Sequence, residues 1–233
     1  MHLFYTPDIL LTGEMPEEES NHAVKVLRLT EGDEILLVDG KGTFHDAVIS
    51  RAHHKRCAVE ITRSYPDENK WPFRIHVAVA PTKNMDRIEW FAEKSTEIGI
   101  DRITLLKCRF SERKDVKAER LNKILVSAMK QSLKAYLPEL EPMTEFKKFV
   151  QQPFSGQKFI AHCYKDAERV LLKQAYKPGS DMLILIGPEG DFSEEEVQLA
   201  IANGFSPVSL GKSRLRTETA ALVACHSVHV INE

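Results

Sequence analysis

Three short stretches of the sequence place residue types suited to ligand binding directly after an apolar run that predicts a strand. They are residues 80–83 (APTK), 186–190 (IGPEG) and 210–220 (LGKSRLRTETA). Ligands of open parallel sheets bind beyond the carboxyl ends of the strands. These stretches are therefore the first candidates for a binding site, provided that the strands before them are parallel neighbours.

The second stretch is a glycine turn between a predicted strand and a predicted helix. Ser193 and Glu196 match a capping box, so the helix is expected to begin there. Four acidic side chains between 189 and 195 would repel a phosphate, and the GxxxxGK pattern of a phosphate-binding loop is absent. The glycines favour close backbone approach to a neutral or cationic ligand, although a tight turn alone would also explain them.

The third stretch places two arginines at the start of a predicted alanine-rich helix. Thr217 and Glu218 have an ordinary structural explanation, because Thr can cap a helix and an acidic first turn suits the helix dipole. Arg214 and Arg216 have none, since the dipole disfavours cations at that end. They predict an anionic partner, either a carboxylate or a phosphate.

The elements around these stretches change character near residues 64–72 (SYPDENKWP), a polar segment with two prolines. Before it, a brief helix and several short strands predict a small barrel-like β domain over residues 1–70. After it, strands and amphipathic helices alternate through residues 71–233, which predicts a parallel α/β sheet. Helical periodicity places Val26, Trp90 and Leu133 in the cores of these domains, among other apolar residues.

Composition excludes several classes of protein. The chain has 233 residues, 42% of them hydrophobic, and no apolar run approaches the length of a membrane span. The N-terminus does not resemble a signal peptide, and four widely spaced cysteines fit a reducing cytosol. His53, His54 and Cys57 lack a fourth ligand, so we expect no metal.

The net charge of −2 gives no global basic field, but residues 107–123 (KCRFSERKDVKAERLNK) are locally basic. Interleaved acids allow this segment to be a solvated helix face, and its cations allow it to be a patch for RNA phosphates. Composition leaves both interpretations open.

The motifs carry a family resemblance. GPEGDFS-x-x-E followed by LG-x-x-x-LRTETA resembles the RsmE-type methyltransferases of the SPOUT superfamily, which methylate N3 of uridine 1498 in bacterial 16S ribosomal RNA. NHAVKVLRLTEGDEILLVDGKG resembles the PUA-like N-terminal region of the family, and KNMDRIEW-x-x-x-KSTEIG resembles its first catalytic-domain helix. The resemblance spans the whole chain.

The resemblance implies a PUA-like β-barrel domain at residues 1–70 that binds RNA, and a SPOUT α/β domain at 71–233 with a C-terminal trefoil knot. It also implies a cytoplasmic homodimer that binds S-adenosylmethionine and 16S ribosomal RNA of the small ribosomal subunit. Leu210 and Leu215 would form apolar walls for the adenine. The full cofactor-binding set would be Ile186, Gly187, Pro188, Glu189, Gly190, Leu210, Gly211, Leu215, Arg216, Thr217, Thr219 and Ala220.

Methyl transfer to uracil N3 requires removal of a proton or stabilisation of the anion left behind. Arginine is not deprotonated in proteins, so Arg216 is predicted to stabilise the uracil anion electrostatically. Glu189 or Glu218 could accept the proton, and we take Arg216 and Glu189 as the catalytic candidates. The candidate RNA-binding residues are His22, Lys25, Arg28, Lys83, Arg87, Arg109 and Arg113.

Three positions depart from the family pattern: Asp191 replaces a usual glycine, and Ser213 and Lys134 stand where arginines are common. Two other functions stay open. The chain could be an RNA-binding protein of this fold without catalysis, or a SPOUT methyltransferase acting on another ribosomal or transfer RNA site. A Rossmann nucleotide enzyme would need GxGxxG after the first strand, and PTKNMD is not that.

Overall fold

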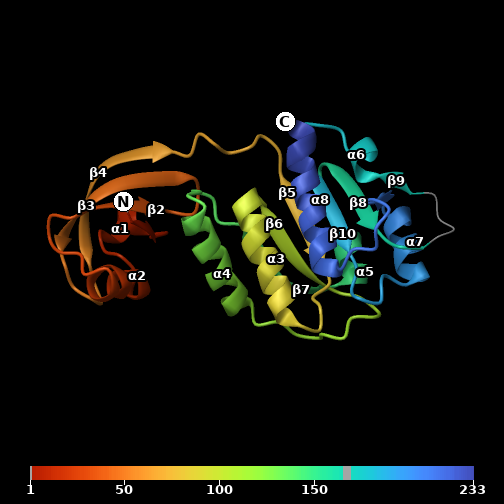
Figure 1. The fold of residues 1–233 in the computed structure, drawn as a ribbon, viewed down its shortest axis with the longest axis horizontal. Coiled ribbons are helices and arrows are strands. Elements are labelled where there is room, and N and C mark those ends of the chain that lie inside the picture. The colour runs from red at the N-terminus through yellow and green to blue at the C-terminus, as the bar shows by residue number, and fades with distance from the viewer. Residues whose placement is uncertain (1, 165–168) are drawn as a thin grey trace. The chain divides into compact units, whose positions relative to one another are not determined.

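The computed structural model describes residues 2–164 and 169–233, and the chain divides into two compact units. One is formed by Met1–Lys70 with Val126–Leu137, and the other by Trp71–Leu125 with Pro138–Glu233 (Figure 1). The segment between the last strand of the first unit and the first strand of the second is the polar one noted in the sequence.

The first unit holds a four-stranded sheet in the order β1-β2-β3-β4. β1 is parallel to β2, and the remaining neighbours are antiparallel. The tight turn between β2 and β3 is held by Asp39, whose Oδ1 accepts the N–H groups of Lys41 and Thr43 at 2.7 and 2.9 Å. The strands are β1 (Leu3–Tyr5), β2 (Glu34–Val38), β3 (Thr43–Arg51) and β4 (Ala58–Pro66), and a short helix α1 (Ile9–Thr12) follows β1.

The helix predicted early in the chain is interrupted. α2 (Glu17–Asn21) passes into a π-helical turn at His22–Val26, where the N–H of Leu27 donates to the carbonyl of His22 at 3.0 Å. The wider turn changes which positions face inward. Ala23 is buried, but Val26 is 63% exposed, so the predicted core position of Val26 is wrong.

Polar contacts attach the segment Val126–Leu137 to the rest of the first unit. Lys130 Nζ lies 2.6 Å from Glu19 Oε1, which also accepts the N–H of Tyr5 at 3.3 Å. Asp67 Oδ2 accepts the N–H of Ala135 at 3.0 Å. Because Glu19 is largely buried, removing one partner would leave a poorly compensated charge.

The second unit is built on a seven-stranded sheet in the order β7-β6-β5-β10-β8-β11-β9, whose described strand pairs are all parallel. The predicted parallel α/β sheet is therefore confirmed. β5 and β10 are buried throughout and are apolar except for His76 of β5, as expected for strands covered on both faces. The bounds are β5 (Ile75–Val79), β6 (Arg102–Lys107), β7 (Glu139–Glu145), β8 (Gln157–Ala161), β9 (Val170–Leu171), β10 (Met182–Ile186) and β11 (Ser206–Ser209).

Helices cover this sheet, and α8 packs against both α3 and β5 (Figure 1). Asn84 caps α3, because its side chain accepts the N–H of Asp86 at 3.0 Å. Two predicted core positions are wrong: Trp90 is 41% exposed, and Leu133 is 65% exposed beyond the end of α4. The helices are α3 (Met85–Ile98), α4 (Ala118–Gln131), α5 (Phe146–Val150), α6 (Leu172–Ala175), α7 (Glu194–Ala202) and α8 (Thr217–Asn232).

Candidate functional site

A cavity of about 480 Å³ lies at the carboxyl ends of β8, β10 and β11. Five of the residues predicted to bind a cofactor line it: Ile186, Leu210, Gly211, Leu215 and Ala220. The remaining lining residues are Ala161, His162, Cys163, Arg169, Val208, Ser209, Lys212, Ser213 and Arg214. The predicted residues outside its described lining are Gly187, Pro188, Glu189, Gly190, Arg216, Thr217 and Thr219.

A hydrogen bond joins the two loops that carry the predicted cofactor-binding residues. The hydroxyl of Thr217, at the start of α8, donates to the carbonyl of Gly187 at 3.0 Å. The space beside Gly187 is tight, because a Cβ there would lie 3.1 Å from the backbone N of Phe192 and 3.2 Å from the carbonyl carbon of Asp191. The second and third stretches therefore meet at the edge of the sheet where the parallel strands end.

The acidic side chains of the first of these loops bind backbone N–H groups. Glu189 Oε1 accepts the N–H of Lys83 at 3.0 Å, which ties the end of β10 to the loop after β5. The predicted capping box is confirmed: Ser193 Oγ accepts the N–H of Glu196 at 3.3 Å, and Glu196 Oε2 accepts that of Ser193 at 2.9 Å.

Asp191 is explained by its backbone and by its side chain. Its φ of 66° lies in the left-handed region, where glycine is favoured and aspartate is tolerated. Its Oδ2 accepts the N–H of Cys163 at 2.7 Å, which ties the loop after β10 to the end of β8. The side chain that glycine would lack therefore adds a link between two strand ends.

The second loop exposes its cations. Lys212, Arg214 and Arg216 are all exposed, and the first two line the cavity. Arg216 occupies the N-cap position of α8, so the predicted capping by Thr217 is wrong; the Thr217 hydroxyl binds Gly187 instead. Glu218 is buried behind this loop, with Oε1 3.9 Å from Nε of Arg87.

The sequence analysis missed the loop after β8. His162, Cys163 and Arg169 line the cavity, and an Arg169 N–H donates to the carbonyl of His162. Burial lowers the pKa of His162, and the neighbouring Arg169 adds to this effect. The available signal was that KFIAHC also predicts a strand, whose carboxyl end holds a histidine.

The candidate RNA-binding residues of the first unit lie in and after the π-helical turn. The ring of His22 packs edge-on against Phe4, with centroids 6.0 Å apart. Lys25 and Arg28 are exposed, and Arg28 has a φ of 58°. Their spacing of three residues would place the side chains on one face of an α-helix, but the wider π-helical turn does not have that geometry.

The candidate RNA-binding residues of the second unit each have a described partner. Arg113 donates to the carbonyls of Thr82 and Lys83 at 3.3 and 2.6 Å, so it stabilises the loop after β5. Arg109 NH1 lies 3.1 Å from a carboxylate oxygen of Glu195. The others pair as Lys83 with Glu112 and Arg87 with Glu218.

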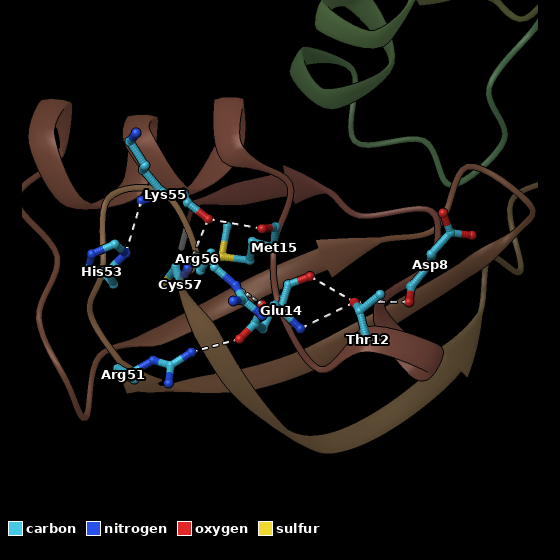
Figure 2. A network of polar contacts seen from close by, with 10 residues as sticks. Asp8, Thr12, Glu14, Met15, Arg51, His53, Lys55, Arg56 and Cys57 are labelled. Atoms are coloured by element: carbon cyan, nitrogen blue, oxygen red, sulfur yellow. Dashed lines mark hydrogen bonds and ion pairs between the residues drawn. The ribbon is translucent and has the colours of Figure 1, made fainter.

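The end of β3 and its connection to β4 carry Arg51, His53, Lys55 and Arg56, and they form a polar network with the segment after α1 (Figure 2). Glu14 contacts both Arg51 and Arg56, at 2.6 and 2.8 Å. His53 accepts the N–H of Lys55 through Nδ1 at 3.3 Å, and Cys57 is buried. Among residues 2–164 and 169–233, no group of three or more His, Cys, Asp or Glu is arranged to hold a metal ion.

Residues 69–229 match the family model of an RNA methyltransferase domain, and residues 16–62 match that of an RNA methyltransferase PUA domain. Ribosomal RNA small subunit methyltransferase E of Synechocystis is 30% identical over 220 residues, covering 90% of this chain and 70% of the relative. The chain belongs to this methyltransferase family.

Two solved structures extend the similarity to the whole chain. A probable rRNA-methyltransferase from Porphyromonas gingivalis is 44% identical with a TM-score of 0.94, over 100% of this chain and 98% of that one. The ribosomal RNA small subunit methyltransferase E from Neisseria gonorrhoeae, bound to S-adenosylmethionine, is 30% identical with a TM-score of 0.85. The match covers 99% of this chain and 98% of that one. Across the described residues, no helix has the length and apolar character needed to cross a bilayer.

Proposed function

We propose that this protein transfers a methyl group from S-adenosylmethionine to N3 of the uridine equivalent to 1498 in 16S ribosomal RNA. The observation that carries the proposal is the cavity at the ends of β8, β10 and β11, in a chain of the ribosomal RNA small subunit methyltransferase E family. The N. gonorrhoeae relative bound to S-adenosylmethionine supports the choice of methyl donor.

The residues of the cavity fit this cofactor. Ile186, Val208, Leu210 and Leu215 provide apolar wall for an adenine ring. Lys212 and Arg214 provide cations for anionic groups at the exposed side. The seven predicted cofactor-binding residues that do not line the cavity lie in the two loops. They would contribute to cofactor binding through the loop backbone and through the Thr217–Gly187 hydrogen bond.

Bound S-adenosylmethionine supplies an electrophilic methyl group on a positively charged sulfur. The chain must place uracil N3 in line with that methyl group and deal with the N3 proton. Arg216, exposed at the N-cap of α8, would stabilise the developing uracil anion. Glu189 uses Oε1 to accept the N–H of Lys83, and we assign proton acceptance to its second oxygen.

The same proposal covers assembly and substrate binding. Residues 1–70 would bind RNA as a PUA-like barrel domain, with His22, Lys25 and Arg28 among its contacts, and Lys83, Arg87, Arg109 and Arg113 would contribute from residues 71–233. The protein would act as a cytoplasmic homodimer on the small ribosomal subunit. A trefoil knot would be closed by the chain from β10 onward, which the order β10-β8-β11 supports.

Mass spectrometry of 16S ribosomal RNA tests the target base. RNA from a strain lacking the gene should carry an unmodified uridine at this position. Incubation of its small subunits with the protein and S-adenosylmethionine should add one methyl group at N3. Methylation at another ribosomal or transfer RNA position would refute the target assignment, and absence of any methylation would refute the enzymatic function.

A further inference from the structure

His162 follows β8 and is 4% exposed, yet it lines the 480 Å³ cavity. Its Nδ1 lies 3.3 Å from the backbone N of Tyr164. A backbone N–H can only donate, so Nδ1 must accept. The neutral ring therefore carries its proton on Nε2, and the lowered pKa of His162 favours that neutral form.

The Nε2 atom of His162 is buried and has no hydrogen-bond partner among the described residues. Leaving a buried donor unpaired costs on the order of 1–3 kcal/mol, and such groups in folded proteins usually meet a ligand or a bound water. The cavity that His162 lines is where an acceptor can reach it.

The surroundings select the chemistry of that acceptor. Ile186 of β10 and Val208 of β11 both pair with Ala161, the residue before His162, so His162 follows a strand that lies between two apolar strand ends. Lys212, on the same cavity, is exposed. A neutral donor between apolar walls suits a neutral ring nitrogen or hydroxyl, whereas exposed cations suit carboxylates or phosphates.

We propose that Nε2–H of His162 donates a hydrogen bond to the adenosine portion of S-adenosylmethionine and so fixes how the nucleoside is seated. The proposal rests on the cofactor site proposed above. It makes His162 a positioning residue that sets cofactor affinity. The KM for S-adenosylmethionine should then depend on His162, and kcat at saturating cofactor should not.

Calorimetry with two ligands tests this. S-adenosylhomocysteine carries the adenosine portion and an amino-acid group, whereas 5′-methylthioadenosine carries the adenosine portion with only a methylthio group at C5′. His162→Asn keeps an acceptor for the N–H of Tyr164 and removes the Nε2 donor, and His162→Gln places an amide N–H near its position. Tyr164→Phe is the matched control, because it removes a different bond of the same loop, from the Tyr164 hydroxyl to the carbonyl of Phe192 at 2.6 Å.

We expect His162→Asn to lower the affinity for both ligands by the same factor, about fivefold, which corresponds to the loss of one neutral hydrogen bond. His162→Gln and Tyr164→Phe should stay within about twofold of the unmodified protein. Unchanged affinity in His162→Asn, a loss confined to S-adenosylhomocysteine, or an equal loss in either of the other two variants would overturn the proposal.

Protein that binds neither ligand before any substitution would instead overturn the cofactor site itself, and this inference with it. Should His162→Asn lower the thermal midpoint by more than a few degrees, His162→Phe provides a second variant that lacks the donor but retains a planar ring. The same fivefold, ligand-independent loss is expected there, and unchanged binding would refute the role of the donor.

Discussion

The loops after β10 and β11 lie at the same edge of the sheet and are built in opposite ways. The β10 loop is acidic, and Glu189 and Asp191 each use a carboxylate oxygen to bind a backbone N–H of another strand end. The β11 loop is basic, and Lys212, Arg214 and Arg216 are exposed. The first loop fixes the geometry of the site, while the second presents charge to ligands.

This contrast explains why a glycine turn next to a binding cavity can be rich in carboxylates. Carboxylates bound to N–H groups are charge-assisted structural links, and they are compatible with a ligand that carries a positive sulfur. The exposed cations of the β11 loop are placed for anionic ligands instead. Substitutions in the two loops should therefore separate stability from activity, except at Glu189, whose second carboxylate oxygen we propose as the acceptor of the N3 proton.

The largest expected effect is on turnover in the β11 loop. Arg216→Ala should lower methyl transfer by about 100-fold, the cost of removing one group that stabilises a developing anion. Cofactor affinity, measured by calorimetry, should remain unchanged. Ser213→Ala in the same loop is the control and should retain turnover. An Arg216→Ala protein with normal turnover would show that the exposed arginine does not act on the reacting base.

Glu189→Gln tests whether the β10 loop also takes part in chemistry. The amide oxygen can still accept the N–H of Lys83, so the free energy of unfolding should change by less than about 0.5 kcal/mol. Turnover should fall by about 100-fold, because an amide cannot accept the N3 proton. If single-turnover kinetics show no loss, Glu189 is purely structural and the contrast between the loops is complete.

Asp191 should matter for stability rather than for chemistry. Asp191→Ala loses the side-chain bond to Cys163 and leaves an alanine at a φ of 66°, which strains the backbone. Urea unfolding should therefore show a free energy of unfolding lower by about 2–3 kcal/mol. Asp191→Gly removes the bonds from the side chain to the N–H groups of Cys163 and Phe192 without that strain, and it should lose about 1–2 kcal/mol. A glycine variant less stable than the alanine variant would contradict the assigned backbone strain.

The smallest effect is expected at Arg214. Arg214→Ala should change the free energy of unfolding by less than about 0.5 kcal/mol, since the side chain is exposed. The sequence predicts an anionic partner for this side chain, and RNA phosphates are one such partner. The slope of log RNA affinity against log salt should then become shallower by about 0.7–1. Salt titrations of both proteins with 16S RNA check this, and an unchanged slope would remove Arg214 from the RNA-binding surface.

The sequence predicted the parallel sheet because largely apolar strands such as β5, β6 and β10 occur in a region where strands and amphipathic helices alternate. It did not predict β7 (Glu139–Glu145), whose sequence ELEPMTE is neither apolar nor alternating. β7 is an edge strand, so its pairing with β6 alone determines its conformation. The exposed Trp90 shows the same limit, because helical periodicity does not identify which faces neighbouring elements cover.

The candidate site was predicted in part. Ile186, Leu210 and Leu215 belong to two of the strand-end stretches and line the cavity, because they end apolar strands or follow them closely. Their contact with a cofactor, which the family resemblance implies, stays a prediction. It missed His162, since nothing in the sequence indicates that β8 lies between β10 and β11. Local sequence also could not show that Thr217 would bind Gly187 rather than cap its own helix, because that choice depends on a residue thirty positions away.

The Thr217–Gly187 hydrogen bond has a consequence for how the protein folds. It joins residues 30 apart in the chain. We expect it to form late in folding, because the end of β10 and the start of α8 come together at an edge of the sheet where β8 and β11 also pair. Contacts that form after the folding transition state slow unfolding without speeding folding. Loss of the Thr217 hydroxyl is therefore expected to raise the unfolding rate and so shorten the lifetime of the native state. The refolding rate should remain nearly unchanged.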